Sequence, residues 1–265
     1  KVLLWTLSAA ILTAPVYLSG INVTAAPIMQ ENKTEVDKIK EEKKEPVSGY
    51  EEEFQKNNEK VSETMKNKKV SRTAQNESCG ETATWALDNG VLTISGTGAI
   101  ADYSDTSEIP WKDQKKTITK IVIENGITEI GIQAFYDCTN VTEVVFPDTL
   151  TTIKRGAFFQ CYSLEAAILP DGVTTLEQGA FAKCSSMMQY SGKGVTSYGQ
   201  FAFQDTALSS FEIPKGVADI ESLVFLNCGI EEYTLAEGNE TYMVKDGILF
   251  SKSGDELVIY PAEKK

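Results

Sequence analysis

The sequence predicts a β-rich fold of the α/β class, a right-handed solenoid with one short parallel strand in each coil of 22–23 residues. A short phrase, Ala or Val followed by Phe, returns five times, and its rings lie 23, 23, 22 and 22 residues apart. Apolar residues two positions apart open each repeat, as in a strand with one buried face. Hairpin signals flank the repeats on both sides. The repeated rings are Phe135, Phe158, Phe181, Phe203 and Phe225.

Composition divides the chain into five segments. Residues 1–25 are predicted as a signal peptide and 26–78 as a disordered or partly helical charged linker. Residues 79–117 are expected to form an N-terminal β cap, 118–235 the repeats, and 236–265 a C-terminal β-hairpin cap. Caps are expected because the terminal coils of a solenoid would otherwise expose their core.

The N-terminal segment has the layout of a secretory signal. A nearly continuous apolar run from Val2 to Leu18 follows Lys1, and Val23 and Ala25 supply the small residues of a cleavage site. The alternative is an uncleaved membrane anchor, since roughly 20 apolar residues can span a bilayer. We therefore expect an extracellular or cell-surface location reached through this signal, with membrane contact only if the segment stays uncleaved.

The charged linker mixes Lys and Glu and has few large apolar residues. Burial of so few apolar side chains cannot offset the entropy of ordering the backbone. Two interpretations remain open: a spacer that lifts the folded part from a cell surface, and a plain disordered tail.

Both flanks of the repeats read as hairpins. Strand-forming residues at 84–87 and 91–94 flank Asp88, Asn89 and Gly90, and Asn-Gly is a strong signal for a two-residue turn. We assign this hairpin and Trp111 to the N-terminal cap. Short strands of the C-terminal hairpin are expected at 242–244, 247–250 and 257–260.

Each repeat is expected to place alternate residues of its strand inside the coil. Pro147, Pro170 and Pro214 end three of the strands, because proline lacks the N–H that would continue a ladder. In one repeat, 187–194, glycine and serine interrupt the strand pattern, and we predict that this coil bends or frays. Two interpretations remain open: sequence drift in a tolerant repeat, and a functional kink or ligand contact. The inward pairs are Ile121 with Ile123, Val144 with Phe146, Ala167 with Leu169, Phe211 with Ile213, and Tyr233 with Leu235.

Charge and composition exclude several classes of function. The formal net charge is −13, and an acidic module repels phosphate backbones, so nucleic acid is not an expected partner. The chain has no histidine, which excludes a Ser-His-Asp triad, a Cys-His pair and a His-ligated zinc. An enzyme that uses carboxylates alone would need two acids converging in a cleft. The acids of the cap segment show no such spacing, so we predict a solvated loop there and no enzymatic activity, cofactor or metal. Those acids are Asp102, Asp105, Glu108 and Asp113.

Four of the five cysteines hold one position of the repeat, three residues after the repeated Phe. Stacked coils would bring them into a column at roughly 4.8 Å per coil, which favours buried thiols. Disulfides between neighbouring coils remain an alternative, whereas a column cannot surround a zinc ion. The four are Cys138, Cys161, Cys184 and Cys228, and Cys79 is expected to be exposed.

The outer face of the stacked strands is the predicted binding surface. Val122, Val145 and Ile168 would form one exposed apolar strip, because side chains in a strand alternate between faces. Exposed apolar patches with a charged rim often mark protein contacts. The alternative is a sheet face rich in β-forming residues with no partner. The acids expected to flank or extend the strip are Glu143, Glu212 and Glu232.

Together these motifs resemble the BspA-like leucine-rich repeat family. The resemblance is carried by residues 127–147 and 173–185 and by the strand at 208–214. The cap segment 85–98 and the hairpin segment 244–250 are also similar to segments that flank or interrupt such repeats.

The resemblance implies a secreted or surface-displayed protein without enzymatic activity, of a kind associated with adhesion and protein binding. It supplies no catalytic residues, and Thr206 in place of Cys and Val224 in place of Ala depart from the repeat. We therefore expect a leucine-rich repeat module, monomeric, that binds an extracellular protein or glycan through its parallel-sheet face. The alternative is a structural spacer within a larger secreted protein, with no ligand of its own.

Overall fold

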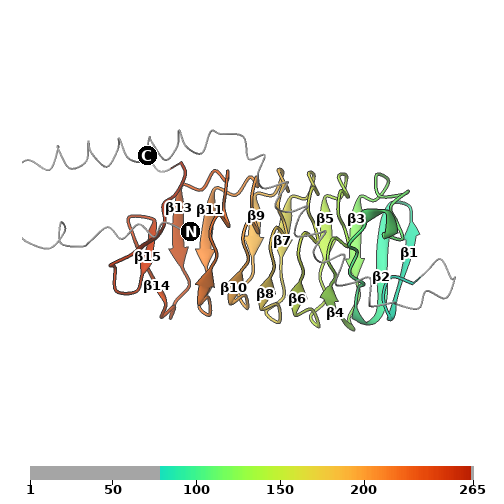
Figure 1. The fold of residues 1–265 in the computed structure, drawn as a ribbon, viewed down its shortest axis with the longest axis horizontal. Coiled ribbons are helices and arrows are strands. Elements are labelled where there is room, and N and C mark those ends of the chain that lie inside the picture. The colour runs from blue at the N-terminus through green and yellow to red at the C-terminus, as the bar shows by residue number, and fades with distance from the viewer. Residues whose placement is uncertain (1–77, 264–265) are drawn as a thin grey trace, which may run out of the picture. The chain divides into compact units, whose positions relative to one another are not determined.

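The computed structural model describes residues 78–263, and this part of the chain forms a β-solenoid (Figure 1). The predicted signal peptide, 1–25, lies outside the described residues, as does the predicted linker apart from Ser78. Among the described residues the only helix is the short 3-10 helix η2 (Thr106–Glu108), so the coils consist of strands and turns. The predicted solenoid with parallel strands is confirmed.

The predicted strand opens each coil, and these strands form the first strand series. Their pairing is parallel and in register, with Ile121 opposite Val144 and Ala167 opposite Tyr190. The ladder joins β3 to β5, β7 to β9 and β11 to β13, and it is interrupted between these pairs. The series consists of β3 (Lys120–Ile123), β5 (Glu143–Val145), β7 (Ala166–Ile168), β9 (Gln189–Ser191), β11 (Ser210–Ile213) and β13 (Glu232–Leu235).

A second strand series, which the sequence pattern did not predict as strands, follows the first in each coil. Its parallel pairing is continuous along the solenoid, and Ile130, Ile153, Leu176 and Tyr198 occupy one buried column. The series therefore provides the unbroken sheet of the fold. It consists of β4 (Ile127–Ile130), β6 (Thr152–Ile153), β8 (Thr175–Leu176), β10 (Ser197–Tyr198) and β12 (Asp219–Ile220).

The Ala-Phe phrase turns the chain on the third side of each coil. The N–H of Phe135 donates to the carbonyl of Ala157 at 2.8 Å, and the N–H of Phe158 donates to the carbonyl of Ala180 at 2.8 Å. The residues two before and two after each repeated Phe have positive φ, and glycine occupies two of these positions, Gly156 at +60° and Gly179 at +62°. Each turn therefore carries two left-handed residues, and neighbouring turns hydrogen-bond through their backbones.

The repeated rings form a continuous stack inside the solenoid, as predicted. Neighbouring centroids are 5.1 Å apart from Phe135 to Phe158 and from Phe158 to Phe181, and 6.1 Å and 5.7 Å apart in the following coils. Trp111 extends the stack toward the N-terminal end, with its ring 5.4 Å from that of Phe135. The described core thus has one aromatic spine that runs through all five Ala-Phe turns.

The chain before the first coil forms a hairpin of β1 (Thr82–Asp88) and β2 (Val91–Ala99), paired antiparallel. Asn89 and Gly90 have φ of +48° and +82°, the left-handed pair that a type I′ turn requires. β2 also pairs in parallel with β3 and β4, so the hairpin continues directly into the solenoid.

The chain after the last coil forms a three-stranded antiparallel sheet of β14 (Tyr242–Lys245), β15 (Ile248–Ser251) and β16 (Leu257–Ile259). Asn239, buried just before β14, holds this sheet to the preceding coil: its side-chain amide donates to the carbonyl of Pro214 at 2.8 Å. The segment boundaries at both ends, and the role of these hairpins as caps, stay predictions.

All five cysteines are free and buried. The repeat cysteines lie in the predicted column, and Cys161 and Cys184 donate their S–H to the carbonyls of Phe135 and Phe158 in the preceding coils, each at 3.3 Å. The expectation of an exposed Cys79 is wrong. Its N–H donates to the carbonyl of Ala83 at 3.0 Å, and its carbonyl accepts from the N–H of Ala101, so the chain folds back over the first hairpin and covers the thiol.

The irregular repeat forms a strand, contrary to the prediction that it bends or frays. Tyr190 points into the core from β9, where its ring stacks on Phe211 at 5.2 Å and meets Phe203 edge-on at 4.6 Å. The aromatic side chain supplies the inward contact that glycine and serine around it cannot. The ladder of the first series is interrupted beyond β9, as it is between β5 and β7.

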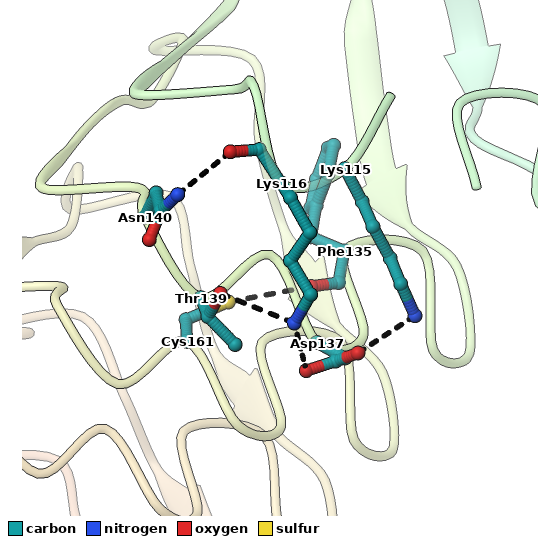
Figure 2. A network of polar contacts seen from close by, with 7 residues as sticks. All are labelled: Lys115, Lys116, Phe135, Asp137, Thr139, Asn140 and Cys161. Carbon is teal, nitrogen blue, oxygen red and sulfur yellow. Dashed lines mark hydrogen bonds and ion pairs between the residues drawn. The ribbon is translucent and has the colours of Figure 1, made fainter. Parts of the chain in front are cut away.

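A polar network joins the segment before β3 to the first Ala-Phe turn (Figure 2). Asp137 accepts from Lys115 at 2.7 Å and from Lys116 at 3.0 Å, and the side chain of Asn140 donates to the carbonyl of Lys116. Partial burial by itself raises the pKa of the Asp137 carboxyl, but the hydrogen bonds and charges of the two lysines outweigh it and lower the pKa. The carboxylate therefore fastens the N-terminal segment to the first coil.

We expect Phe158→Ala to destabilise the fold by about 3–5 kcal/mol, because it removes a buried ring from the middle of the spine and leaves a cavity. Chemical denaturation monitored by circular dichroism measures this. Ile168→Ala, an exposed position, is the control and should change stability by less than about 1 kcal/mol. Equal effects of the two substitutions would contradict the expected contribution of the ring stack to stability.

We expect all five thiols to resist alkylation at pH 8 while the protein is folded. Burial raises the pKa of Cys79 and Cys138 to about 12 and that of Cys228 to about 11, so thiolate is scarce, and the sulfurs are also shielded. Mass spectrometry after iodoacetamide treatment should find no adduct on the native protein and complete modification in denaturant. Rapid native labelling of Cys79 would place it at the surface after all.

We expect Asp137 to make stability depend on pH at the acidic end. Its pKa in the fold lies below the usual value of 3.8, so its contribution is complete above that value and is lost as the pH falls through the folded pKa. Asp137→Asn should lower stability at pH 7 and make unfolding less sensitive to pH below about 4. Parallel stability curves for the two proteins in urea between pH 7 and pH 3 would contradict this role.

Candidate interaction surface

The candidate residues lie on the outward side of the first strand series, which we call the front face. It consists of alternate residues in β3, β5, β7, β9, β11 and β13, whose neighbours along the strand point into the core. In β3, for example, Ile121 and Ile123 are buried, whereas Val122 between them is not. Because neighbouring coils are in register, equivalent outward positions line up as columns along the solenoid.

The apolar strip follows one such column. Val122 lies directly opposite Val145 in the parallel ladder. Ile168 holds the equivalent place in the next coil, which is tied to β5 by the N–H of Glu165 donating to the carbonyl of Thr142 at 3.3 Å. Exposure increases along the strip from the half-buried Val122 to 40 % for Val145 and 58 % for Ile168. The structure thus places the three aliphatic side chains at equivalent outward positions of consecutive coils.

An ion pair borders the strip. Glu143 lies opposite Lys120 in the neighbouring column, and its carboxylate accepts from the lysine ammonium at 2.8 Å. Both side chains are well exposed, so the pair adds little to stability. Its effect on the surface is to place a charged rim next to Val145.

The two remaining candidates, Glu212 and Glu232, lie farther along the front face. Glu212 is opposite Thr234 and Glu232 is opposite Ser210, so the two acids are diagonal neighbours on β11 and β13. Strand β9 separates them from the strip. They therefore form a second, acidic part of the front face and do not flank the strip itself.

Sequence reasoning missed three exposed apolar side chains of the repeats: Leu223, which is 46 % exposed in the last Ala-Phe turn, and two others near the strands. Met188, just before β9, is 66 % exposed, and Tyr162, which follows Cys161, is 39 % exposed. The available signal was the adjacent pair Met187 and Met188, because neighbouring residues of an extended chain point to opposite sides and only one of the two can be buried. The pair lies within the repeat whose sequence looked irregular. None of the three exposed residues belongs to the strip column.

No group of three or more Asp, Glu or Cys among residues 78–263 is arranged to hold a metal ion. Asp102, one of the cap acids, is engaged structurally: it accepts from the N–H of Ile132 at 2.9 Å and pairs with Lys154 at 3.3 Å. In the same part of the chain, no helix has the length and apolar character needed to cross a membrane.

Comparison with known proteins agrees with this architecture. Residues 113–231 match the BspA-type leucine-rich repeat region in six copies. A leucine-rich repeat protein from Eubacterium ventriosum is similar to this chain at 25 % identity and a TM-score of 0.55, over 71 % of this chain and 51 % of that one. No curated relative matches the chain.

Two further solved structures are similar. One is a leucine-rich cell surface protein from Faecalibacterium prausnitzii, with 23 % identity and a TM-score of 0.48, over 72 % of this chain and 63 % of that one. The other is the pneumococcal vaccine antigen PcpA, with 18 % identity and a TM-score of 0.53, over 71 % of this chain and 56 % of that one.

This chain spans about half to three-fifths of the length of these three structures. The similarity to these structures is a similarity of fold. The six matched copies identify the type of repeat. The repeats of this chain belong to the BspA-type leucine-rich repeat family, and the protein is a leucine-rich repeat protein of that type.

Proposed function

We propose that this chain is a non-enzymatic binding module, displayed outside the cell, that holds an extracellular protein on its front face. The observation that carries the proposal is the strip of Val122, Val145 and Ile168, three aliphatic side chains in one column on consecutive coils. Partly or largely exposed aliphatic side chains in a row gain free energy when a partner removes them from water.

The chemistry of the strip favours a protein ligand over a glycan. Sugar rings stack on aromatic faces, and the strip has none. A protein partner can instead cover the aliphatic column with its own apolar side chains and meet the rim at Lys120 and Glu143, the usual arrangement of an apolar centre with a polar border. The acidic pair, Glu212 and Glu232, adds a site for a basic side chain of the same partner.

Export is the second part of the proposal. It is supported by the layout of residues 1–25, a basic start, an apolar run and small residues at a cleavage position. The BspA-type repeat, which resembles those of secreted and surface-displayed proteins, supports the same location.

We expect Ile168→Lys to reduce capture of the partner at least tenfold, because it places a charge at the most exposed position of the apolar strip, at a cost of about 1.4 kcal/mol or more. The measurement is a pull-down of extracellular proteins by the full chain, followed by titration of the captured protein. Met188→Lys is the matched control, since it makes the same charge change at a side chain that is equally exposed but outside the strip.

Both variants should keep the unfolding curve of the parent protein, because neither side chain is buried. If Ile168→Lys and Met188→Lys capture the partner equally well, the strip is not the binding site. If the parent chain captures no protein, the result supports the alternative that the chain is a structural spacer without a ligand of its own.

A further inference from the structure

The last Ala-Phe turn differs from the four before it in its backbone hydrogen bonds. In each earlier turn, the N–H of the repeated Phe and the N–H two residues later donate to carbonyls of the next turn, as from Phe203 to Val224 at 3.0 Å. The equivalent donors of the last turn are the N–H groups of Phe225 and Asn227. Neither of these N–H groups has an acceptor within residues 78–263. The ladder of turns therefore ends, in the described chain, on two free backbone donors.

Side-chain exposure changes at the same place. The residue two positions before each repeated Phe has a left-handed backbone, and in the four earlier turns it is buried. In the last turn this residue is Leu223, which is 46 % exposed. Its exposure follows from its position in the stack, because each earlier turn has a further coil hydrogen-bonded to it. The four buried residues are Gln133, Gly156, Gly179 and Phe201.

The C-terminal sheet packs on the other two sides of the last coil. Strands β14 and β15 lie beside β13 (Figure 1), and the N–H of Tyr233 in β13 donates to the carbonyl of Gly247 at 2.9 Å. On the side of the second strand series, the hydroxyl of Tyr242 donates to the carbonyl of Ala218 at 3.4 Å. Residues 221–223 stay exposed. We call residues 221–223, with the N–H groups of Phe225 and Asn227, the open end.

The surroundings of the open end are acidic. Asp219 in β12 and Glu221 just after it are exposed, as is Glu231, which follows the last turn. No lysine or arginine lies between Lys215 and Lys245. Exposed carboxylates without nearby cations attract a positively charged partner.

The earlier turns show what covers a surface of this kind. The first turn is covered by the backbone of the second, whose carbonyls at Ala157 and Phe159 accept the two N–H groups at 2.8 Å and 2.9 Å. Water can accept the same hydrogen bonds at the open end, but it leaves Leu223 exposed, whereas burial of an aliphatic side chain is favourable. A polypeptide segment supplies both the carbonyls and an apolar side chain. Lysine or arginine in that segment also meets the carboxylates.

A second copy of this chain fits the open end poorly. Two open ends that face one another place N–H donors opposite N–H donors and carboxylates opposite carboxylates. The first turn of another copy is already covered: the ring of Trp111 stacks on that of Phe135 at 5.4 Å, and Asn140 donates to the carbonyl of Lys116 at 2.6 Å. The occupant that matches the open end is therefore a segment of a different protein.

We propose that the open end binds a basic segment of a partner protein, which stacks on the last Ala-Phe turn as one more turn of the solenoid. Backbone carbonyls of the segment accept from the N–H groups of Phe225 and Asn227, and an apolar side chain covers Leu223. Its lysine or arginine side chains meet Asp219 and Glu221. The open end is separate from the front face, so this inference does not rest on the function proposed above.

The test starts from a phage-displayed library of random dodecapeptides selected on the full chain. We expect the enriched peptides to combine lysine or arginine with a large apolar residue. Synthetic peptides of these sequences should bind Leu223→Lys about tenfold more weakly than the parent chain, because the substitution replaces the apolar contact by a charge that repels the peptide. Met188→Lys makes the same charge change at another exposed side chain and is the matched control. Ile168→Lys, on the front face, should also bind like the parent.

Amide hydrogen exchange, measured residue by residue by NMR, locates the peptide. Binding should slow exchange at Phe225 and Asn227 about fivefold, because their N–H groups gain acceptors, and should leave Phe203 unchanged. A library without such peptides, or equal binding to Leu223→Lys and Met188→Lys, would overturn the proposal. Exchange at Phe225 and Asn227 that slows as the parent chain is concentrated without peptide would overturn it too, since a second copy would then be the occupant.

Discussion

The stacking of one buried ring on the next, coil after coil, is the constraint on which the rest of the structure depends. Ring centroids 5.1–6.1 Å apart require neighbouring coils to be nearly superimposable. Each coil must therefore return to the same point with almost the same number of residues. The left-handed residues on either side of each repeated Phe make this possible, because they reverse the chain within a few residues. Burial of the spine stabilises these unfavourable backbone conformations, including the non-glycine ones at Gln133 and Asp137.

The same constraint determines how the protein presents its surface. Once coils are in register, a residue type repeated in the sequence becomes a column on the outside of the solenoid. Val122 and Val145 become neighbours in this way although 23 residues separate them. A surface of columns on a rigid sheet suits contact with another macromolecule. Among residues 78–263, the structure shows no cluster of metal-ligating groups.

The three sides of the coil differ in what they offer. The front face carries exposed aliphatic side chains and an acidic pair, and the second strand series provides the continuous sheet that keeps the coils aligned. The Ala-Phe side carries the turns whose backbones hydrogen-bond from one coil to the next, and Asp137 of its first turn pairs with Lys115 (Figure 2).

The sequence by itself determined the period, the inward rings, the prolines that end strands, the Asn-Gly hairpin and the column of buried cysteines. All of these depend on local chemistry or on a repeat that is visible in one dimension. The tertiary structure decided the rest. Two-residue segments such as β6 become strands only because stacked coils supply hydrogen-bonding partners. Cys79 is buried because the chain folds back over it. The irregular repeat keeps its strand because the ring of Tyr190 packs on Phe211 in the core. Glu212 and Glu232 are separated from the apolar strip because position along the axis follows from the order of coils. Each of these outcomes depends on contacts between residues distant in sequence, which no local pattern specifies.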